Sequence, residues 1–356
     1  MIDPTPLRGR PLDREREGVC LITGATGFIG GHLAQRLRAE GYRVRCLARG
    51  SSDTRQLETL DVEIVVGDLA RPDLLAMAVT GCSYVFHCAA WVSDWGTADE
   101  IARVNVAGTR NLLEACADAS VKRVIHFSTT DVYGYPGGAP IDEAFVAAGF
   151  RNWYAQTKLA AEAEVWGAAR SHHLDAVILR PATVYGPRST DVIGAIARAL
   201  RRGQMLLIDH GRVLAGLCYV DNLTDAALLA LRHEAAPGQA FNVCDGLPVT
   251  WKQFTDDLAG GLGCRQARLS SPYWLANAVG FSLECGYRFL RRTTHLHTEP
   301  LLSRQAVHVL GIDQNFSNRK LRELLGWEPR VDYAAGLAAT VAWLAADMQE
   351  SAASSA

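Results

Sequence analysis

Short apolar, often β-branched runs alternate with longer stretches of helical periodicity along the first half of the chain. A long helix is expected over residues 99–119, and another begins near Tyr154. Strands that alternate with helices build βαβ units, and right-handed crossovers then place helices on both faces of a parallel sheet. The pattern predicts an α/β fold with a doubly wound parallel sheet. The strand-like runs are residues 19–23, 42–48, 62–67, 84–90, 123–128 and 175–180.

The pattern becomes irregular after Pro181, where we expect loops, short helices and an aromatic-rich segment. In doubly wound sheets ligands bind beyond the carboxyl ends of the strands, so the irregular part is expected to form a smaller C-terminal lobe over the binding site. The compositions of the two chain ends predict a flexible leader and a frayed tail. The expected division is a leader over 1–18, a Rossmann domain over 19–185 with strands also from about 211–245, the lobe over 186–210 and 246–345, and a tail over 346–356.

Charge and cysteine usage narrow the class of protein. The 356 residues have a formal net charge of −2, which gives no electrostatic footprint for nucleic acid. The nine cysteines form no CxxC pair and several lie in apolar runs, so we expect them to be reduced and buried. No apolar stretch follows a basic start, as a secretory signal would require. Together these features predict a cytoplasmic protein.

A glycine-rich segment, TGATGFIG, directly follows the first strand and opens the first helix. Gly24 suits the tight turn, Gly27 lets the backbone approach a diphosphate, and Gly30 allows close helix–strand packing. Free N–H groups and the helix dipole at such a helix start favour an anion. The segment therefore predicts a dinucleotide cofactor.

The end of the second strand is where an adenosine ribose is expected. Ala48 occupies the position of the acidic residue that would bind the 2′-hydroxyl of NAD, and Arg49 and Ser52 follow it. A cation beside hydroxyls suits a 2′-phosphate, so we favour NADP(H), with NAD(H) as the alternative if Arg49 is only a surface residue. Asp68, after the third strand, is expected either to contact the adenine or to cap the helix that begins near Pro72.

Tyr154 and Lys158 are four residues apart on an expected helix and so lie on one face. An ordinary tyrosine titrates near ~10, and a fixed positive charge nearby lowers that value towards neutrality. The fifth strand ends in three hydroxyl residues, Ser128, Thr129 and Thr130, any of which could orient a substrate oxygen or act as a turn residue. The arrangement predicts acid–base chemistry on a hydroxyl or carbonyl group.

The TGxxGFIG loop, the hydroxyl run, YxxxK and RPATVYGPR (180–188) occur in the order typical of extended short-chain dehydrogenase/reductases, and the chain resembles that family over about 18–345. The resemblance implies that Thr129 holds the substrate oxygen, Tyr154 is the acid/base, and Lys158 binds the nicotinamide ribose. It also places Asn105 beneath the active site, as a fourth residue of the catalytic set. The cofactor-binding residues that it implies are Gly24, Thr26, Gly27, Phe28, Ile29, Gly30, Arg49, Ser52, Asp68, Leu69, Ala89, Ala90, Ser128, Tyr154, Lys158, Pro181 and Val184.

Many members of this family modify nucleotide sugars, and a nucleotide-sugar epimerase or dehydratase is the alternative activity. Such members commonly carry an asparagine where this chain has Thr183, and an Arg-Asp pair where it has Ala215 and Gly216. Loss of a bidentate arginine removes the grip that a diphosphate needs, although Arg188 or Arg212 could substitute for it.

Residues 299–344 resemble the 3β-hydroxysteroid dehydrogenase branch of the family. The apolar, aromatic segment before them, 271–292, is expected to be a lid over a hydrophobic pocket, an interfacial helix with peripheral membrane contact, or a core helix of the lobe. We therefore expect hydride transfer between NADP(H) and a secondary alcohol or ketone of a hydrophobic steroid-, polyketide- or 3-oxoacyl-like substrate. Trp91, Trp95 and Trp153 are expected to help form an apolar wall.

Three further interpretations complete the sequence-based picture. A non-catalytic dinucleotide sensor is a remote alternative, because the chain retains every catalytic residue type. No metal site is expected, since His295 and His297 have no carboxylate or cysteine at ligand spacing. By analogy with the family, a homodimer is expected through the helices around 99–119 and 154–170.

Overall fold

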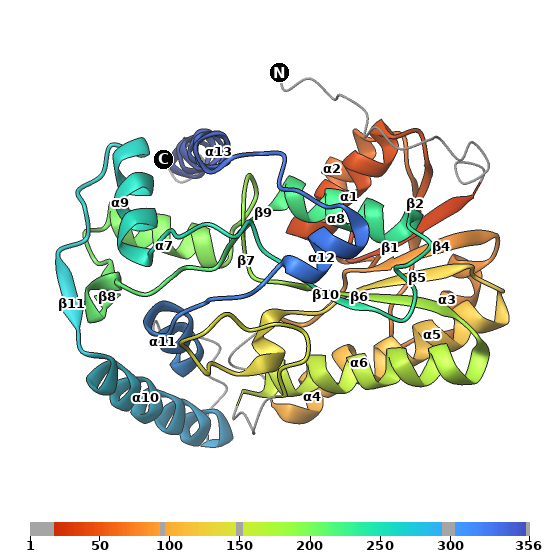
Figure 1. Ribbon diagram of the computed structural model, residues 1–356, viewed down its shortest axis with the longest axis horizontal. Coiled ribbons are helices and arrows are strands. Elements are labelled where there is room, and N and C mark those ends of the chain that lie inside the picture. The colour runs from red at the N-terminus through yellow and green to blue at the C-terminus, as the bar shows by residue number, and fades with distance from the viewer. Residues whose placement is uncertain (1–17, 93–96, 147–151, 294–302, 354–356) are drawn as a thin grey trace.

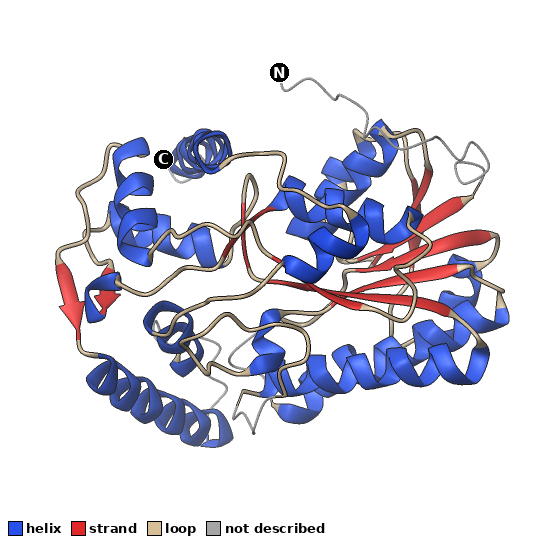
Figure 2. Ribbon diagram, in the orientation of Figure 1, coloured by secondary structure: helices blue, strands red, loops and turns tan. Residues whose placement is uncertain are grey.

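The computed structural model describes residues 18–92, 97–146, 152–293 and 303–353. Seven parallel strands form the central sheet, in the order β10-β6-β5-β4-β1-β2-β3 (Figures 1 and 2). Strand order reverses between β1 and β4, which is where doubly wound sheets bind ligands. The predicted α/β fold is confirmed. The strands are β1 (Val19–Thr23), β2 (Arg43–Ala48), β3 (Glu63–Val66), β4 (Cys82–His87), β5 (Arg123–Phe127), β6 (Asp175–Pro181) and β10 (Ala240–Val243).

Helices cover both faces of this sheet (Figure 1). Successive residues of β1 explain why, because Cys20 and Ile22 pack into one apolar core while Val19 and Leu21 pack into the other. The first core is shared with α1 and α8, and the second with α3, α5 and α6. The helices of this domain are α1 (Phe28–Ala39), α2 (Arg55–Glu58), α3 (Pro72–Val79), α4 (Ala98–Ala102), α5 (Gly108–Asp118), α6 (Trp153–His172), α8 (Val220–Arg232) and α12 (Arg319–Leu325).

The smaller lobe lies beyond the carboxyl ends of the strands, with its own apolar core around Trp251 and Tyr185 (Figure 1). Of the strands expected from about 211–245, only β10 joins the main sheet, because β9 (Leu217–Tyr219) pairs with β7 (Thr183–Tyr185). The last helix extends past Asp347, where the sequence predicts a polar tail. The lobe elements are α7 (Val192–Arg201), β8 (Leu206–Ile208), α9 (Trp251–Gly261), β11 (Leu269–Ser271), α10 (Tyr273–Thr293), α11 (Arg304–Gly311) and α13 (Tyr333–Ala353).

Helix α10 differs from the short helices expected in this region, and its apolar side chains face outwards. Trp274 is 70% exposed and Phe281 is 51% exposed. Its polar residues Asn277 and Glu284 instead face α11, where both accept hydrogen bonds from Arg304. The core-helix interpretation of this segment is therefore wrong. Within the described part of the chain, no helix is long and apolar enough to cross a membrane.

The helix expected over 99–119 is interrupted. A capping box formed by Thr97 and Glu100 starts α4 at Ala98, and a π-helical segment, Arg103–Ala107, separates α4 from α5. Single π-turns within α-helices are often found at functional sites. This one contains Asn105.

Candidate active site

The glycine-rich turn joins β1 to α1 at the switch point of the sheet. Gly24 has a φ of +71°, and a Cβ there would lie 2.7 Å from the backbone nitrogen of Ala89, so the turn requires glycine. A Cβ at Gly30 would collide with the carbonyl oxygen of Gly24. Gly27 is the N-cap of α1 and is exposed, so no side chain covers the N–H groups of the first turn at this position. The turn therefore offers room and donors for a diphosphate.

Asn105 fixes the loop that follows β4. Its Oδ1 accepts a hydrogen bond from the backbone N–H of Trp91 at 2.7 Å, and its Nδ2 donates to the Trp91 carbonyl at 3.2 Å. The same Nδ2 donates to Thr157 Oγ1, which is on α6, at 3.1 Å. Asn105 is 2% exposed, and its bond to Thr157 is buried, whereas the two bonds to Trp91 are partly buried. One side chain thus ties the loop with Ala89 and Ala90 to the helix that carries Tyr154.

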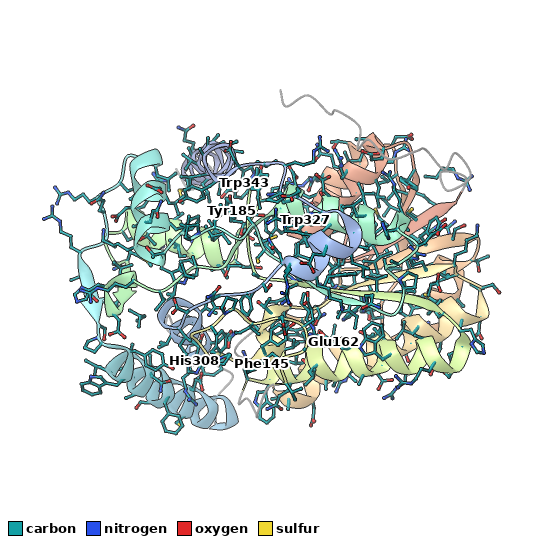
Figure 3. The ribbon with its side chains drawn as sticks, in the orientation of Figure 1. Phe145, Glu162, Tyr185, His308, Trp327 and Trp343 are labelled. Atoms are coloured by element: carbon teal, nitrogen blue, oxygen red, sulfur yellow. The ribbon has the colours of Figure 1, made fainter. Side chains whose placement is uncertain are left out.

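Lys158 lies under the carboxyl end of β5 and is 2% exposed. Its Nζ donates to the carbonyl oxygen of Phe127 at 2.6 Å and lies 3.4 Å from His126 Nε2. Burial lowers the pKa of Lys158 to about 8, although the carboxylate of Glu162, one turn further along α6 (Figure 3), opposes this shift. An ammonium held by two fixed acceptors retains a third N–H for a ribose hydroxyl.

A buried chain of histidine and threonine side chains connects the glycine-rich turn with Asn105. Thr23 Oγ1 accepts from the N–H of Ala89, so its hydroxyl hydrogen goes to His87 Nδ1 at 2.8 Å. Thr109 Oγ1 donates to the carbonyl of Asn105, so His87 Nε2 carries a hydrogen and donates to Thr109 at 2.8 Å. Burial lowers the pKa of His87 to about 3, which agrees with this neutral tautomer.

The sequence interpretation missed this chain and the contact between His126 and Lys158. The available signal was a histidine at the end of each of two neighbouring apolar strands, β4 and β5. Burial, then the charge of Lys158, lowers the pKa of His126 well below its ordinary value, so the ring is a neutral acceptor for the ammonium.

The hydroxyl run after β5 provides two distinct groups. Thr129 Oγ1 accepts from the backbone N–H of Asp131 at 3.2 Å, which caps a 3-10 turn, Thr130–Tyr133, and leaves its own hydrogen to donate. Ser128 Oγ is buried without a hydrogen-bond partner among the described residues. A buried, unpaired hydroxyl is costly unless a ligand satisfies it. Thr130, the third residue of the run, is also buried.

Tyr154 lies in the first turn of α6. The side chain of Asn152 caps this helix by accepting from the backbone N–H of Tyr154 at 2.7 Å. Thr157 Oγ1 donates to the carbonyl of Tyr154 at 2.9 Å, which joins this turn to the Asn105 contacts. The cap and the Asn105 contacts therefore fix the backbone of Tyr154, and Lys158 follows it on the same face.

The adenosine end of the expected cofactor site is more open. Arg49 is exposed at the end of β2, and its carbonyl accepts from the N–H of Ser52 in a tight turn. Asp68 Oδ1 accepts from the backbone N–H of Ala70 at 2.8 Å. The N-cap of α3 is Arg71, so the alternative in which Asp68 caps this helix is wrong. Arg49 and Asp68 follow the neighbouring strands β2 and β3, as a ribose–adenine site requires.

The other expected cofactor-binding residues lie along the same edge of the sheet, except that Val184 belongs to the separate β7–β9 pair. The first-turn N–H groups of α1, the unpaired Ser128 hydroxyl and the directed Lys158 ammonium together fit a nicotinamide dinucleotide. The other expected cofactor-binding residues along this edge are Thr26, Phe28 and Ile29 at the glycine-rich turn, Leu69 after β3, Ala89 and Ala90 after β4, and Pro181 at the end of β6.

The lobe contributes a polar and aromatic cluster that the sequence interpretation also missed. Gln305 on α11 donates to Asp131 Oδ2 at 2.9 Å and to the hydroxyl of Tyr135, both in the loop after β5. His308 (Figure 3) stacks on Tyr135 and accepts from, or donates to, the hydroxyl of Tyr273 at 2.8 Å. Burial lowers the pKa of His308 to about 4. The cluster joins the lobe to the loop that carries Thr129.

The remaining sequence-based expectations have mixed outcomes. Trp91 and Trp153 are 39% and 37% exposed, whereas Trp95 lies outside the described residues. His295 and His297 also lie outside them. Within the described ranges, no group of His, Cys, Asp and Glu is suited to a metal ion. All nine cysteines are unpaired; six are buried, Cys88 and Cys264 are partly exposed, and Cys285 is exposed.

Comparison with known proteins identifies the family. The pattern of the NAD dependent epimerase/dehydratase family matches residues 20–244. A 2-alkyl-3-oxoalkanoate reductase from Shewanella oneidensis is 30% identical over 329 residues, 89% of this chain and 84% of that protein. The decarboxylating sterol-4-alpha-carboxylate 3-dehydrogenase of Bos taurus is 28% identical over 322 residues, 88% of each chain.

A solved structure, MoeE5 in complex with UDP-glucose and NAD, is 27% identical, with a TM-score of 0.72 over 93% of this chain and 100% of that one. The chain therefore belongs to the NAD dependent epimerase/dehydratase family and is an NAD(P)-dependent dehydrogenase/reductase of the extended short-chain type.

Proposed function

We propose that the protein is an NADP(H)-dependent oxidoreductase that interconverts a secondary alcohol and a ketone on a hydrophobic substrate. The observation that carries this proposal is the lack of a cationic side chain at Ala215 and Gly216. Ala215 is completely buried, and Gly216 has a φ of +58° with its α-carbon packed against Gln314. Neither position directs a charged side chain into the site. This supports a substrate without a diphosphate.

Two other arginines could have bound a substrate diphosphate in place of the absent Arg-Asp pair, but their positions do not favour a nucleotide sugar. Arg212 is exposed at the end of the 3-10 turn Asp209–Gly211. Arg188 packs against Gly31 in α1, next to the glycine-rich turn. Trp91 and Trp153 supply exposed aromatic surface beside the catalytic loop, which suits a hydrophobic substrate.

The names of two relatives narrow the substrate class further. In a 2-alkyl-3-oxoalkanoate and in a sterol 4-alpha-carboxylate, the carboxylate is attached to the carbon next to the one that is reduced or oxidised. We therefore propose an α-substituted 3-oxo or 3-hydroxy acid, or a close ester of one, as the substrate class.

The proposed reaction in the reducing direction follows from the positions of three side chains. The nicotinamide cofactor, when bound, supplies the hydride. Thr129 donates a hydrogen bond to the substrate oxygen with the hydrogen that its cap contact leaves available. Tyr154 gives its phenolic proton to that oxygen as the carbonyl is reduced. Lys158, held by Phe127 and His126, stabilises the resulting phenolate and binds the ribose.

The preference for NADP(H) is supported by Arg49 and Ser52 at the end of β2 and by the absence of an acidic residue at Ala48. We expect Arg49→Met to raise the KM for NADPH about 10- to 100-fold and to leave the KM for NADH nearly unchanged, because a charged hydrogen bond contributes roughly 1.5–3 kcal/mol. Arg55→Met, six residues further along and paired with Asp53, is the matched control. A clear NADH preference in the parent enzyme would end this part of the proposal.

A substrate panel tests the function as a whole. NADPH oxidation is measured with 2-alkyl-3-oxo acids and their esters, with 3-oxosteroids and with simple ketones, and UDP-sugars are assayed separately for conversion by chromatography. We expect turnover with the branched 3-oxo compounds and none with the sugars. Conversion of a UDP-sugar without net NADPH consumption would support the nucleotide-sugar alternative instead.

A further inference from the structure

Arg188 lies in the loop between β7 and α7, and its guanidinium packs directly onto the first turns of α1. An ideal Cβ at Gly31 would lie 2.5 Å from Nη1 of Arg188 and 2.7 Å from Nη2. Any other residue at position 31 would thus displace the guanidinium. Gly31 follows the last glycine of the glycine-rich turn, and it provides the space in which the arginine side chain lies.

The arginine is held there at an energetic cost. Arg188 has a φ of +71°, a left-handed conformation that non-glycine residues rarely adopt. Its Nη1 is buried without a hydrogen-bond partner among the described residues. Strained backbone and an unsatisfied buried donor persist where a functional requirement holds them in place.

Two other arginines of the sheet domain lie beside carboxylates. Arg36 lies less than two turns beyond Gly31 on α1. Its Nη2 is 3.0 Å from Asp225 Oδ1 and 3.1 Å from Glu40 Oε1. Arg180 forms two bonds with Glu162 at 2.6 and 2.9 Å. Asp221 lies 3.2 Å from Nδ1 of His32, whose Nε2 contacts the carbonyl oxygen of Pro187 in the Arg188 loop. Within the described residues, no ion pair to Arg188 is observed.

The charge of the Arg188 guanidinium is also unfavourable at the start of α1 when no anion is bound. The start of a helix carries a partial positive charge, and an arginine beside it is repelled unless an anion lies between them. A diphosphate at this point would accept hydrogen bonds from both the helix N–H groups and the guanidinium.

We propose that Arg188 binds the diphosphate of the dinucleotide cofactor from the side of the lobe, and that Gly31 is glycine in order to admit it. This inference rests on the proposed use of a nicotinamide dinucleotide. It gives the loop that connects the sheet domain to the lobe a direct contact with the cofactor. Its role is distinct from that of Arg49, which is proposed for the 2′-phosphate.

The test compares ligands that differ only in their phosphates, using the full-length protein. Dissociation constants are measured by calorimetry for NAD⁺, NADP⁺ and ADP-ribose, which contain the diphosphate, and by competition for 2′-AMP, which does not. We expect Arg188→Met to weaken the first three about 10- to 100-fold and 2′-AMP less than about 3-fold. Arg49→Met is the matched control, with losses for NADP⁺ and 2′-AMP only.

A second variant separates the contact from the fold. Gly31→Ala adds a methyl group where the guanidinium lies, while alanine favours helix by about 1 kcal/mol. We expect it to weaken NAD⁺ to a similar extent in the parent protein and to have no further effect in Arg188→Met, as in a double-mutant cycle of contacting residues. Without ligand, Arg188→Met should melt no lower than the parent, because it removes an unpaired buried cation.

Three results would overturn the inference: unchanged binding of NAD⁺ and ADP-ribose by Arg188→Met, an equal loss for 2′-AMP, or additive losses in the double variant. Its failure is distinguishable from failure of the proposed function, which the substrate panel would reveal while the parent protein still bound the dinucleotide.

Discussion

The sheet domain and helix α10 of the lobe place their large apolar side chains in opposite ways. Around Lys158, polar groups are buried in an apolar domain and bonded to one another, with His126 and Phe127 as acceptors. On α10 the polar residues Asn277 and Glu284 also point inwards, but large apolar side chains such as Trp274 remain on the outer face. The first arrangement fixes a catalytic geometry. The second leaves a surface whose apolar side chains contribute little to the stability of the fold.

The largest expected effect is at the centre of the sheet-edge site. Tyr154→Phe removes the proton donor and leaves the helix cap from Asn152 in place. We expect kcat to fall by a factor on the order of 1000, while the dissociation constant for NADPH changes less than about 3-fold. Stopped-flow turnover and fluorescence titration measure the two quantities. Near-normal kcat would remove Tyr154 from the mechanism.

The next effect is a dependence of stability on pH. Burial lowers the pKa of Lys158 to about 8, so its charged form is disfavoured in the folded protein. The penalty is complete below pH 8 and is lost as the pH rises from 8 towards the unfolded value near 10.5.

The stability of the parent relative to Lys158→Met should therefore rise by up to about 3 kcal/mol across that interval. Urea unfolding of both proteins at several pH values measures it. Parallel stability curves over this range would contradict a buried ammonium.

A smaller loss is expected from the contact between the β4 loop and α6. Asn105→Ala leaves the N–H and carbonyl of Trp91 without their partner, and we expect a loss of about 2 kcal/mol together with weaker cofactor binding. Asn111→Ala is the matched control, since that side chain makes a single bond to the backbone of Leu69. Thermal unfolding compares the two variants, and equal losses would argue against a special role for Asn105.

The smallest effect is expected on the outer face of α10. Trp274→Gln should change the free energy of unfolding by less than about 0.5 kcal/mol, because the side chain is 70% exposed. Ala276→Gln, two residues away but buried against Ile208 and Val307, should cost several times more. If Trp274→Gln proved the more damaging of the two, the outer face of α10 would be packed in solution and would not differ from the sheet domain in this respect.

The sequence predicted those features that depend on local pattern. The apolar runs gave the strands, and the spacing of Gly24, Gly27 and Gly30 gave the turn before α1. Tyr154 and Lys158 lie on one helix, so their common face followed from their spacing alone.

The features that the sequence did not predict depend on distant contacts. The π-helical segment at Asn105 is joined to Trp91 and Thr157, and Arg188 meets Gly31 across more than 150 residues. Helical periodicity predicts an apolar stripe on α10, but it does not say whether that stripe faces the lobe or the outside. The bonds from Arg304 to Asn277 and Glu284 turn the polar side of α10 towards α11. Such partners cannot be chosen from local pattern because each is one of many possible residues of the same kind.

We propose that the cofactor-side geometry serves the reduction of a ketone on an apolar, α-substituted 3-oxo acid. The most direct measurement follows deuterium from NADPH labelled at C4 of the nicotinamide into the product of a 2-alkyl-3-oxo acid, with mass spectrometry of the alcohol. The account predicts one deuterium at the new carbinol carbon in the parent enzyme and loss of this product in Tyr154→Phe. An unlabelled substrate with full NADPH recovery, alongside conversion of a UDP-sugar, would contradict it.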